Sequence, residues 1–309
     1  MSLTLLQSLS LPGDPAKANE DAFGHDAHAA VVIDGATPLG EGLMPGPSDA
    51  AWLAQFGVRR LMTHLREGDG ARKALRATLA DAQKSFEVLR RHPPEDMWQT
   101  PCASMMLAVE TGSASPEHPA HKPRAEPTSA GSQNPQGRGG SQIELLWFGD
   151  CAALIKEGEA AITVVGETFD MRAHEADRAA QMAKDKKLSP TSGLSRPEFL
   201  GALRTSRNNI NSGSNWLFSP DPRAASHVAR RVMKIAPGSA LLLATDGFWA
   251  LASDYGVYGV DGLMAAALDK GLAALGQQLR AIEALDQGGD KFPRFKTSDD
   301  ATALLLKVV

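Results

Sequence analysis

Short apolar runs constrain the fold of this chain more than any other feature. They lie at residues 3–9, 29–33, 103–109, 143–148, 151–156, 160–164, 240–245 and 301–309. Runs of this length, several of them apolar throughout, are typical of buried strands. Apolar residues three or four apart predict helices over 48–66, capped by Ser48, and over 71–91 and 262–285. Because these elements do not repeat as βαβ units, we expect an α+β fold with layered sheets.

Two polar segments interrupt this pattern. Residues 111–142 are rich in glycine, proline and serine and lack every large apolar residue type. Such a segment buries too little apolar surface to offset the entropy of ordering, so we expect a disordered insertion. Strand-length runs flank it, which favours a long loop between neighbouring strands. Residues 166–226 are the second segment, and for them a solvated surface and a substrate-covering flap are equally good interpretations.

Composition excludes several classes of protein. The 309 residues carry a net charge of −4, which argues against nucleic acid as the main partner. The two cysteines, Cys102 and Cys151, lack the spacing of a disulfide framework or a thiolate metal site. No apolar run approaches the roughly 20 residues of a membrane helix, and no export signal is evident. We therefore expect a cytoplasmic protein without a membrane partner.

Acidic residues occur where the apolar runs begin or end. The sites are Glu20-Asp21, Asp34-Gly35, Gly149-Asp150, Asp246-Gly247 and Asp299-Asp300. Any one of them is better explained as a tight turn, but a set of five at strand ends is not. A sheet brings strand ends to one rim, where carboxylates repel one another unless a cation neutralises them. Hard oxygen ligands of this kind suit Mg²⁺ or Mn²⁺ rather than Zn²⁺.

The order of these motifs resembles that of a known enzyme family. NEDAF (19–23), VVIDGA (31–36), FGDCAALI (148–155), GSALLLATDGFWAL (238–251) and SDDATALLL (298–306) resemble the motifs of the metal-dependent, type 2C protein phosphatases. The resemblance implies a divergent, bacterial-type member with a four-layer αββα sandwich of two antiparallel sheets. It implies one catalytic domain over residues 1–309, acting in signal transduction on a phosphorylated protein.

The resemblance also implies a catalytic metal site. Asp34 would bridge two Mn²⁺ or Mg²⁺ ions, and Gly35 would offer its carbonyl oxygen. Asp246 and Asp299 would complete the shell of one ion. The two ions would activate a water molecule for in-line attack on phosphoserine or phosphothreonine. Catalysis would then depend on Asp34, Asp246 and Glu20.

Further acidic residues would support this centre. The resemblance implies that Glu20 acts through metal-bound water, with Asp21 beside it. Asp150 would help to hold a third ion together with Asp246. Asp300 stands where many family members have asparagine, so the resemblance assigns it no firm ligand role.

The sequence departs from the family at two positions. The usual His-Gly-Gly after Asp-Gly is replaced by Ala36-Thr37-Pro38, which removes the family's candidate proton donor. The arginine that usually contacts phosphate is replaced by Ala16, next to Lys17, which we predict to bind substrate as a point charge. His25 and His28 are best explained as loop or strand-edge residues, although either would serve as a substitute proton donor if it reached the rim.

These departures leave two alternatives to a protein phosphatase. One is a catalytically weak member that binds a phosphoprotein or another partner through the same cleft. The other is a metal-dependent hydrolase of small phosphate esters. Divalent-metal-dependent turnover separates the enzymes from the binding protein, and preference for a phosphopeptide separates the two enzymes. The oligomeric state is left open.

Overall fold

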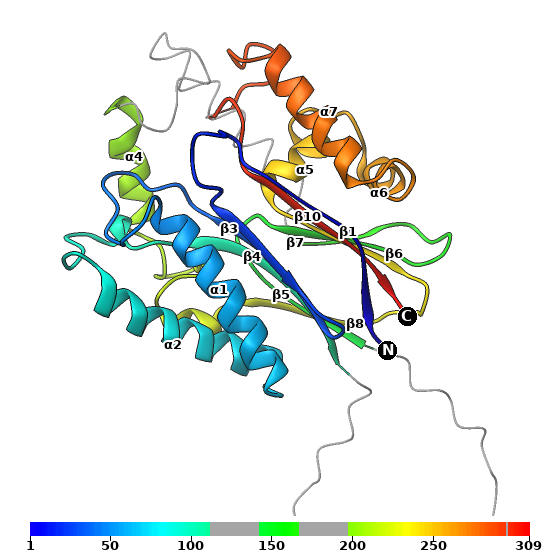
Figure 1. The fold of residues 1–309 in the computed structure, drawn as a ribbon, viewed down its shortest axis with the longest axis horizontal. Helices are drawn as coiled ribbons and strands as arrows, with labels where there is room; N and C mark the ends of the chain where they lie inside the picture. Colours follow the sequence, from blue (N-terminus) through cyan, green and yellow to red (C-terminus); the bar gives the residue numbers. More distant parts are fainter. Residues whose placement is uncertain (112–141, 167–196, 295) are drawn as a thin grey trace, which may run out of the picture.

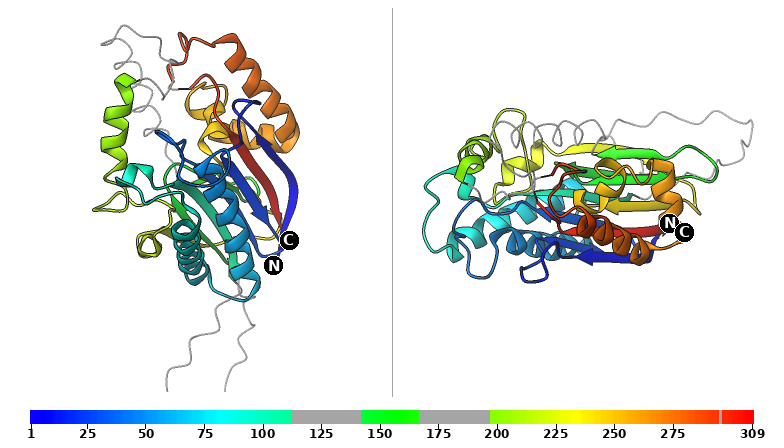
Figure 2. Two further views of the ribbon diagram at one scale, coloured as in Figure 1. Left: turned by 60° about the vertical axis from the view of Figure 1, so that its left-hand side comes forward. Right: turned by 90° about the horizontal axis from the view of Figure 1, so that it is seen from above.

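Two five-stranded antiparallel sheets form the centre of the molecule, and helices cover the outer face of each (Figure 1). The computed structural model describes residues 1–111, 142–166, 197–294 and 296–309. In these residues the first sheet has the strand order β2-β3-β4-β5-β8 and the second β1-β10-β9-β6-β7. The views in Figure 2 show the helices on both sides of the stacked sheets. The expected α+β sandwich is confirmed.

The strands and helices have the following bounds. The strands are β1 (Leu3–Leu11), β2 (Asp21–His25), β3 (Ala29–Gly35), β4 (Ala103–Thr111), β5 (Gln142–Phe148), β6 (Ala152–Lys156), β7 (Thr163–Gly166), β8 (Ala229–Lys234), β9 (Ala240–Ala244) and β10 (Ala301–Val308). The helices are α1 (Asp49–Arg66), α2 (Ala71–Leu89), α4 (Pro197–Arg207), α5 (Asp246–Ser253), α6 (Val260–Asp269) and α7 (Leu272–Leu285). Two 3₁₀ turns are η1 (Met97–Gln99) and η2 (Pro222–Ser226).

The two faces of β3 bury different side chains. Val31 and Ile33 pack into a core shared with α1 and α2. Ala30 and Val32 point the other way, into the core between the sheets. This alternation follows from the two-residue period of a strand, and it explains why residues 29–33 of β3 are all apolar. A third core joins the second sheet to α5, α6 and α7. None of the described helices has the length and apolarity needed to cross a membrane.

The helix predictions are confirmed for α1 and α2 and wrong in one respect for the third. Ser48 caps α1, and its side-chain oxygen accepts a hydrogen bond from the backbone N–H of Ala51. The single helix predicted over 262–285 is two helices, α6 and α7. Gly271 separates them with a φ of 85°, a left-handed conformation that ends a helix. The apolar spacing continues across this break because both helices cover the same sheet.

The strand predictions are confirmed at most positions. The run at 160–164 is shifted, because β7 comprises Thr163–Gly166. Strands β2 and β8 were not predicted, since neither is a continuous apolar run. Most of the predicted insertion, residues 112–141, lies outside the described residues, as do residues 167–196 of the predicted flap. The strands that border 112–141 are β4 and β5, which pair antiparallel, so the prediction that the segment joins neighbouring strands is confirmed.

Candidate metal centre

Three of the predicted acidic residues lie together where the two sheets meet. Asp34 is near the end of β3, Asp150 lies in the turn between β5 and β6, and Asp246 is the first residue of α5, after β9. Each offers a carboxylate oxygen, and these oxygens lie within 4.8 Å of one another. We call Asp34, Asp150 and Asp246 the carboxylate triad. Among the described residues, it is the one group of this kind that could hold a metal ion.

Glycines allow the chain to bring these segments close together. Gly149 has a φ of 65°, which makes the tight turn that presents Asp150. A Cβ on Gly35 would lie 2.7 Å from the carbonyl oxygens of Glu20 and Ala50. A Cβ on Gly247 would lie 1.9 Å from the carbonyl oxygen of Asp300. The glycines next to the acidic residues are therefore required for close packing of the backbone.

A fourth carboxylate lies directly beside the triad. Asp21 on β2 is the cross-strand partner of Asp34 on β3, and like charges in that arrangement destabilise a sheet. Asp21 is 5% exposed; its Oδ2 accepts a hydrogen bond of 2.8 Å from the hydroxyl of Thr245. Its Oδ1 is buried and has no hydrogen-bond partner. Burial and the charges of Asp300 and Asp246 raise the pKa of Asp21 well above its ordinary value, despite the Thr245 hydrogen bond.

The electrostatics of Asp34 show the same excess of negative charge. Burial raises the pKa of Asp34 well above its ordinary value, and the charges of Asp21, Asp246 and Asp150 raise it further. A bound divalent cation would offset this repulsion and give the buried oxygen of Asp21 a nearby positive charge. The donor set consists of carboxylate oxygens with a glycine carbonyl nearby, as Mg²⁺ and Mn²⁺ prefer. The residues therefore fit a hard divalent cation.

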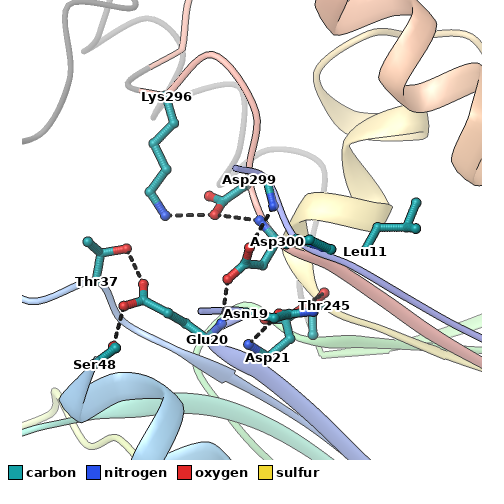
Figure 3. Close-up of polar contacts among 12 residues, drawn as sticks. Leu11, Asn19, Glu20, Asp21, Thr37, Ser48, Thr245, Lys296, Asp299 and Asp300 are labelled. Atoms are coloured by element: carbon teal, nitrogen blue, oxygen red, sulfur yellow. Dashed lines mark hydrogen bonds and ion pairs between the residues drawn. The ribbon is translucent and has the colours of Figure 1, made fainter. Parts of the chain in front are cut away.

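Glu20 lies at the rim but is held by two hydroxyl groups. Ser48 donates a hydrogen bond of 2.5 Å to its Oε1, and Thr37 donates one of 2.6 Å to its Oε2 (Figure 3). Ser48 also caps α1, so the carboxylate is tied to the start of that helix. Thr37 belongs to the segment that replaces the family's His-Gly-Gly. No pattern in the sequence predicts this pair of contacts.

The two acidic residues before β10 have different roles. Asp300 accepts hydrogen bonds from the backbone N–H groups of Gly13 (2.7 Å) and Glu20 (2.6 Å), so its carboxylate fixes the segment that carries Glu20. Asp299 accepts a hydrogen bond of 2.6 Å from the ammonium group of Lys296 (Figure 3). Burial raises the pKa of Asp299, and the charge of Lys296 opposes that rise. Lys296 was not predicted as a site residue.

The predicted cationic and histidine residues lie away from the triad or in solvent. The side chain of Lys17 is 79% exposed, and its Nζ is 3.6 Å from Oδ2 of Asp14. His25 ends β2 opposite Ala30, at the far end of the ladder from the Asp21–Asp34 pair. His28 lies beyond that end and contacts Glu110 at 3.1 Å. The interpretation of both histidines as strand-edge or loop residues is therefore confirmed, and neither serves as a proton donor at the rim.

The cysteines have no catalytic setting. Cys102 and Cys151 are both buried and form no disulfide. Burial raises the pKa of both thiols. For Cys151 the charges of Asp34 and Asp150 raise it further. Because a thiolate is the nucleophilic form, neither side chain is suited to covalent catalysis at neutral pH.

Solved structures with the same fold include Ser/Thr phosphatases. The Mycobacterium tuberculosis serine/threonine phosphatase PstP/Ppp matches with a TM-score of 0.55 and 14% identity, over 100% of this chain and 99% of that one. The PPM Ser-Thr phosphatase MsPP from Mycobacterium smegmatis matches with a TM-score of 0.50 and 15% identity, over 99% of this chain and 100% of that one. PppA, a regulatory component of the type VI secretion system in Pseudomonas aeruginosa, matches with a TM-score of 0.50 and 15% identity, over 100% and 99%.

These similarities extend over the whole chain and show its fold. The chain has the fold of the PPM, or type 2C, phosphatases, which is the fold that the sequence motifs implied. The low identity fits a divergent relative of the solved proteins. No family model matches the sequence, and no curated protein matches it at a significant level.

Proposed function

We propose that this chain hydrolyses phosphoserine or phosphothreonine in proteins and requires Mn²⁺ or Mg²⁺ for the reaction. The observation that supports this most is the carboxylate triad, whose oxygens lie within 4.8 Å of one another at the meeting point of the two sheets. The shared fold supports the same class of reaction. The proposal makes three further predictions: the substrate is a phosphorylated protein, the chain acts in signal transduction, and it is located in the cytoplasm.

The acidic residues have distinct roles in the proposal. Asp34, Asp246 and Asp299 would hold the ions, with the carbonyl oxygen of Gly35. Asp150 would hold a third ion. When bound, the ions lower the pKa of water towards neutrality and offset the charge that develops on the phosphoryl oxygens.

Glu20 and Asp21 would orient water molecules through their carboxylates. Ser48 and Thr37 would keep the Glu20 carboxylate in one position, which matters because catalysis is sensitive to misplacement of about 1 Å. The exposed Lys17 would make a flexible contact with the phosphate of the substrate. The 36–38 segment supplies no proton donor for the leaving group, and such donors contribute about 10²–10⁴-fold. We therefore expect phenolate leaving groups to depart faster than alkoxides.

The decisive experiment is hydrolysis of a phosphothreonine peptide with Mn²⁺. We expect phosphate release that EDTA abolishes and that excess Mn²⁺ restores. Asp34→Asn is the internal control, because it keeps the size of the side chain and removes its charge. Metal-dependent release that persists undiminished in this variant would contradict the proposed site.

A catalytically weak binding protein is the second candidate. It is favoured by the exposure of Lys17, which pairs with Asp14, and by the absence of histidine from residues 36–38. In that case Mn²⁺ would bind and the phosphopeptide would associate without being hydrolysed. A hydrolase of small phosphate esters would instead turn over p-nitrophenyl phosphate with a higher kcat/KM than the phosphopeptide. We keep the single domain over residues 1–309 and the flap at 166–226 as predictions.

A further inference from the structure

Lys296 carries a positive charge into the acidic rim. It lies in the loop before β10, and its side chain extends towards Asp299 (Figure 3). Its Nζ donates a hydrogen bond of 2.6 Å to Oδ1 of Asp299, and 30% of its side chain is exposed. Burial acts to lower the pKa of Lys296, but Asp299, Asp34 and Asp246 outweigh this effect and raise it. A lysine side chain is protonated at neutral pH, so this ammonium group places a positive charge beside Asp299.

Lys296 occupies Oδ1 of Asp299, one of the two carboxylate oxygens that this residue could offer to a metal ion. Oδ1 of Asp299 accepts the hydrogen bond from Lys296 and a second one of 2.9 Å from the backbone N–H of Asp300. A divalent cation that bonded to this oxygen would lie close to the ammonium group, which is 2.6 Å from the same oxygen, and the two positive charges would repel each other. An ammonium group and a divalent cation both neutralise carboxylates, so they compete for the same position.

Two arginines hold the backbone that follows Lys296. Arg280 donates a hydrogen bond of 2.8 Å to the carbonyl oxygen of Asp299. Arg294 donates one of 3.0 Å to the carbonyl oxygen of Thr297, and one of 2.8 Å to the carboxylate of Asp286. Because the backbone at Thr297 and Asp299 is held, rotation of the long side chain of Lys296 is the simplest way for the ammonium group to leave Asp299.

We propose that Lys296 is a resident counter-cation of the site: it neutralises Asp299 in the metal-free protein and competes with divalent ions for that carboxylate. This inference rests on the proposed function, because it assigns Asp299 to the metal site. The competition lowers the affinity of the rim for Mn²⁺. The contact between Lys296 and Asp299 stabilises the fold while no ion is bound. Lys296 thereby sets the concentration of divalent ion at which the site fills.

The test is Mn²⁺ binding to the metal-free protein, measured by isothermal titration calorimetry. We expect Lys296→Met to bind Mn²⁺ about tenfold more tightly than the wild type, as fits removal of one charge near a partly exposed site. Lys296→Arg keeps the charge and should stay within about threefold of the wild type. Lys73→Met is the matched control: Lys73 also lies 2.6 Å from an aspartate, Asp69, but its side chain is 78% exposed and remote from the rim.

Thermal unfolding separates this role from a merely structural one. In EDTA the Tm of Lys296→Met should fall below that of the wild type, and saturating Mn²⁺ should raise it by more than it raises the wild type. If Lys296→Met does not fold without metal, Lys296→Gln provides the same comparison, because its amide still donates a hydrogen bond to Asp299.

Two results would overturn the inference. Unchanged or weaker Mn²⁺ binding by Lys296→Met and Lys296→Gln, with a wild type that binds, would overturn it alone and leave the proposed function standing. Absence of Mn²⁺ binding in the wild type and in every variant would overturn the proposed function as well. Binding gained by Lys296→Met in the absence of binding by the wild type would support the competition.

Discussion

The acidic rim contains two groups of carboxylates that differ in what surrounds them. Asp34, Asp150 and Asp246 gather their oxygens within 4.8 Å of one another. Glu20, Asp299 and Asp300 each accept hydrogen bonds from donors of the chain itself, and we call them the anchored acids. Hydroxyl groups hold Glu20, an ammonium group holds Asp299, and backbone amides hold Asp300.

The two groups differ in role: the anchored acids fix the loops around the site, and the triad concentrates negative charge in it. Donors from the chain stabilise the anchored acids, and the anchored acids in turn fix the loops before β2 and β10. In the triad the oxygens of three carboxylates lie within 4.8 Å of one another, and burial together with the charges of Asp21, Asp246 and Asp150 raises the pKa of Asp34. Repulsion of this kind is relieved by a cation from solution or by protonation. Substitutions in the two groups should therefore affect different properties.

The largest effect is expected in the triad. Asp34→Asn and Asp246→Asn should each lower metal-dependent phosphate release by more than about 10²-fold, since losing a ligand costs more than losing a group that orients one. Both variants should fold, because each removes repulsion. The measurement is kcat/KM for the phosphothreonine peptide at saturating Mn²⁺, with circular dichroism as the control. Full activity in either variant would show that the triad is not the catalytic centre.

Asp21, next to the triad, gives the next largest effect and a dependence on pH. Its pKa is raised in the folded state by burial, so the folded protein binds more protons than the unfolded chain. Stability in EDTA therefore falls as pH rises from about 4, the ordinary pKa of aspartate, through the folded-state pKa. Asp21→Asn removes this penalty and should be more stable than the wild type at pH 8 by about 2–3 kcal/mol, the scale for a buried charged group with an unsatisfied oxygen.

Urea unfolding in EDTA between pH 5 and pH 8 tests this prediction. The stability difference between Asp21→Asn and the wild type should narrow as the pH is lowered. Saturating Mn²⁺ should reverse the sign at pH 8, because the carboxylate then has a cation nearby. A difference that is constant across the pH range would mean that the carboxyl group of Asp21 has an ordinary pKa.

The two groups also differ in how far the sequence predicts them. The triad is predictable because its members directly follow the buried apolar runs of β3, β5 and β9, and the strand ends meet. The partners of the anchored acids are not. Lys296, three residues before Asp299, has the spacing of an ordinary surface pair, and only tertiary packing brings it into the rim. Thr37 and Ser48 contact Glu20 across gaps of 17 and 28 residues.

The fold shows the same limit. Strands buried on both faces are visible as continuous apolar runs, whereas β2 and β8 are edge strands of their sheet. On β8, Arg230 and Arg231 are both exposed, and Arg230 pairs with Glu144 on β5 at 2.5 Å. A strand of this kind owes its position to its neighbour rather than to its own apolar pattern. The break at Gly271 was not predicted for a related reason. Apolar residues of α6 and α7 pack into the same core, so the helical spacing of apolar residues continues across the break.

Among the anchored acids, the contacts of Glu20 should have moderate effects on stability. Ser48→Ala removes a helix cap and a hydrogen bond to a carboxylate, so it should lower the free energy of unfolding by about 2 kcal/mol. Thr37→Val keeps the shape of the side chain and removes one hydrogen bond, so about 1 kcal/mol is expected. Urea unfolding measures the free energy of unfolding of both variants. The difference between their losses is the contribution of the helix cap. Equal losses would indicate that the cap of α1 contributes nothing measurable.

Lys17 should give the smallest effect. Its side chain is 79% exposed and its ion pair with Asp14 is in solvent, and such pairs contribute at most about 1 kcal/mol. Lys17→Met should therefore leave stability unchanged within about 0.5 kcal/mol. If Lys17 contacts the phosphate of the substrate through water, kcat/KM should fall by about two- to fivefold, through KM and more strongly at low ionic strength. A loss of more than tenfold, or one that resides in kcat, would mean that the loop around Lys17 closes over the substrate and excludes water. That outcome would add a cation to the rim, and Lys17 would then act together with the triad in catalysis. Unlike the triad, Lys17 does not follow an apolar run, so the sequence pattern that predicts the triad does not predict this role.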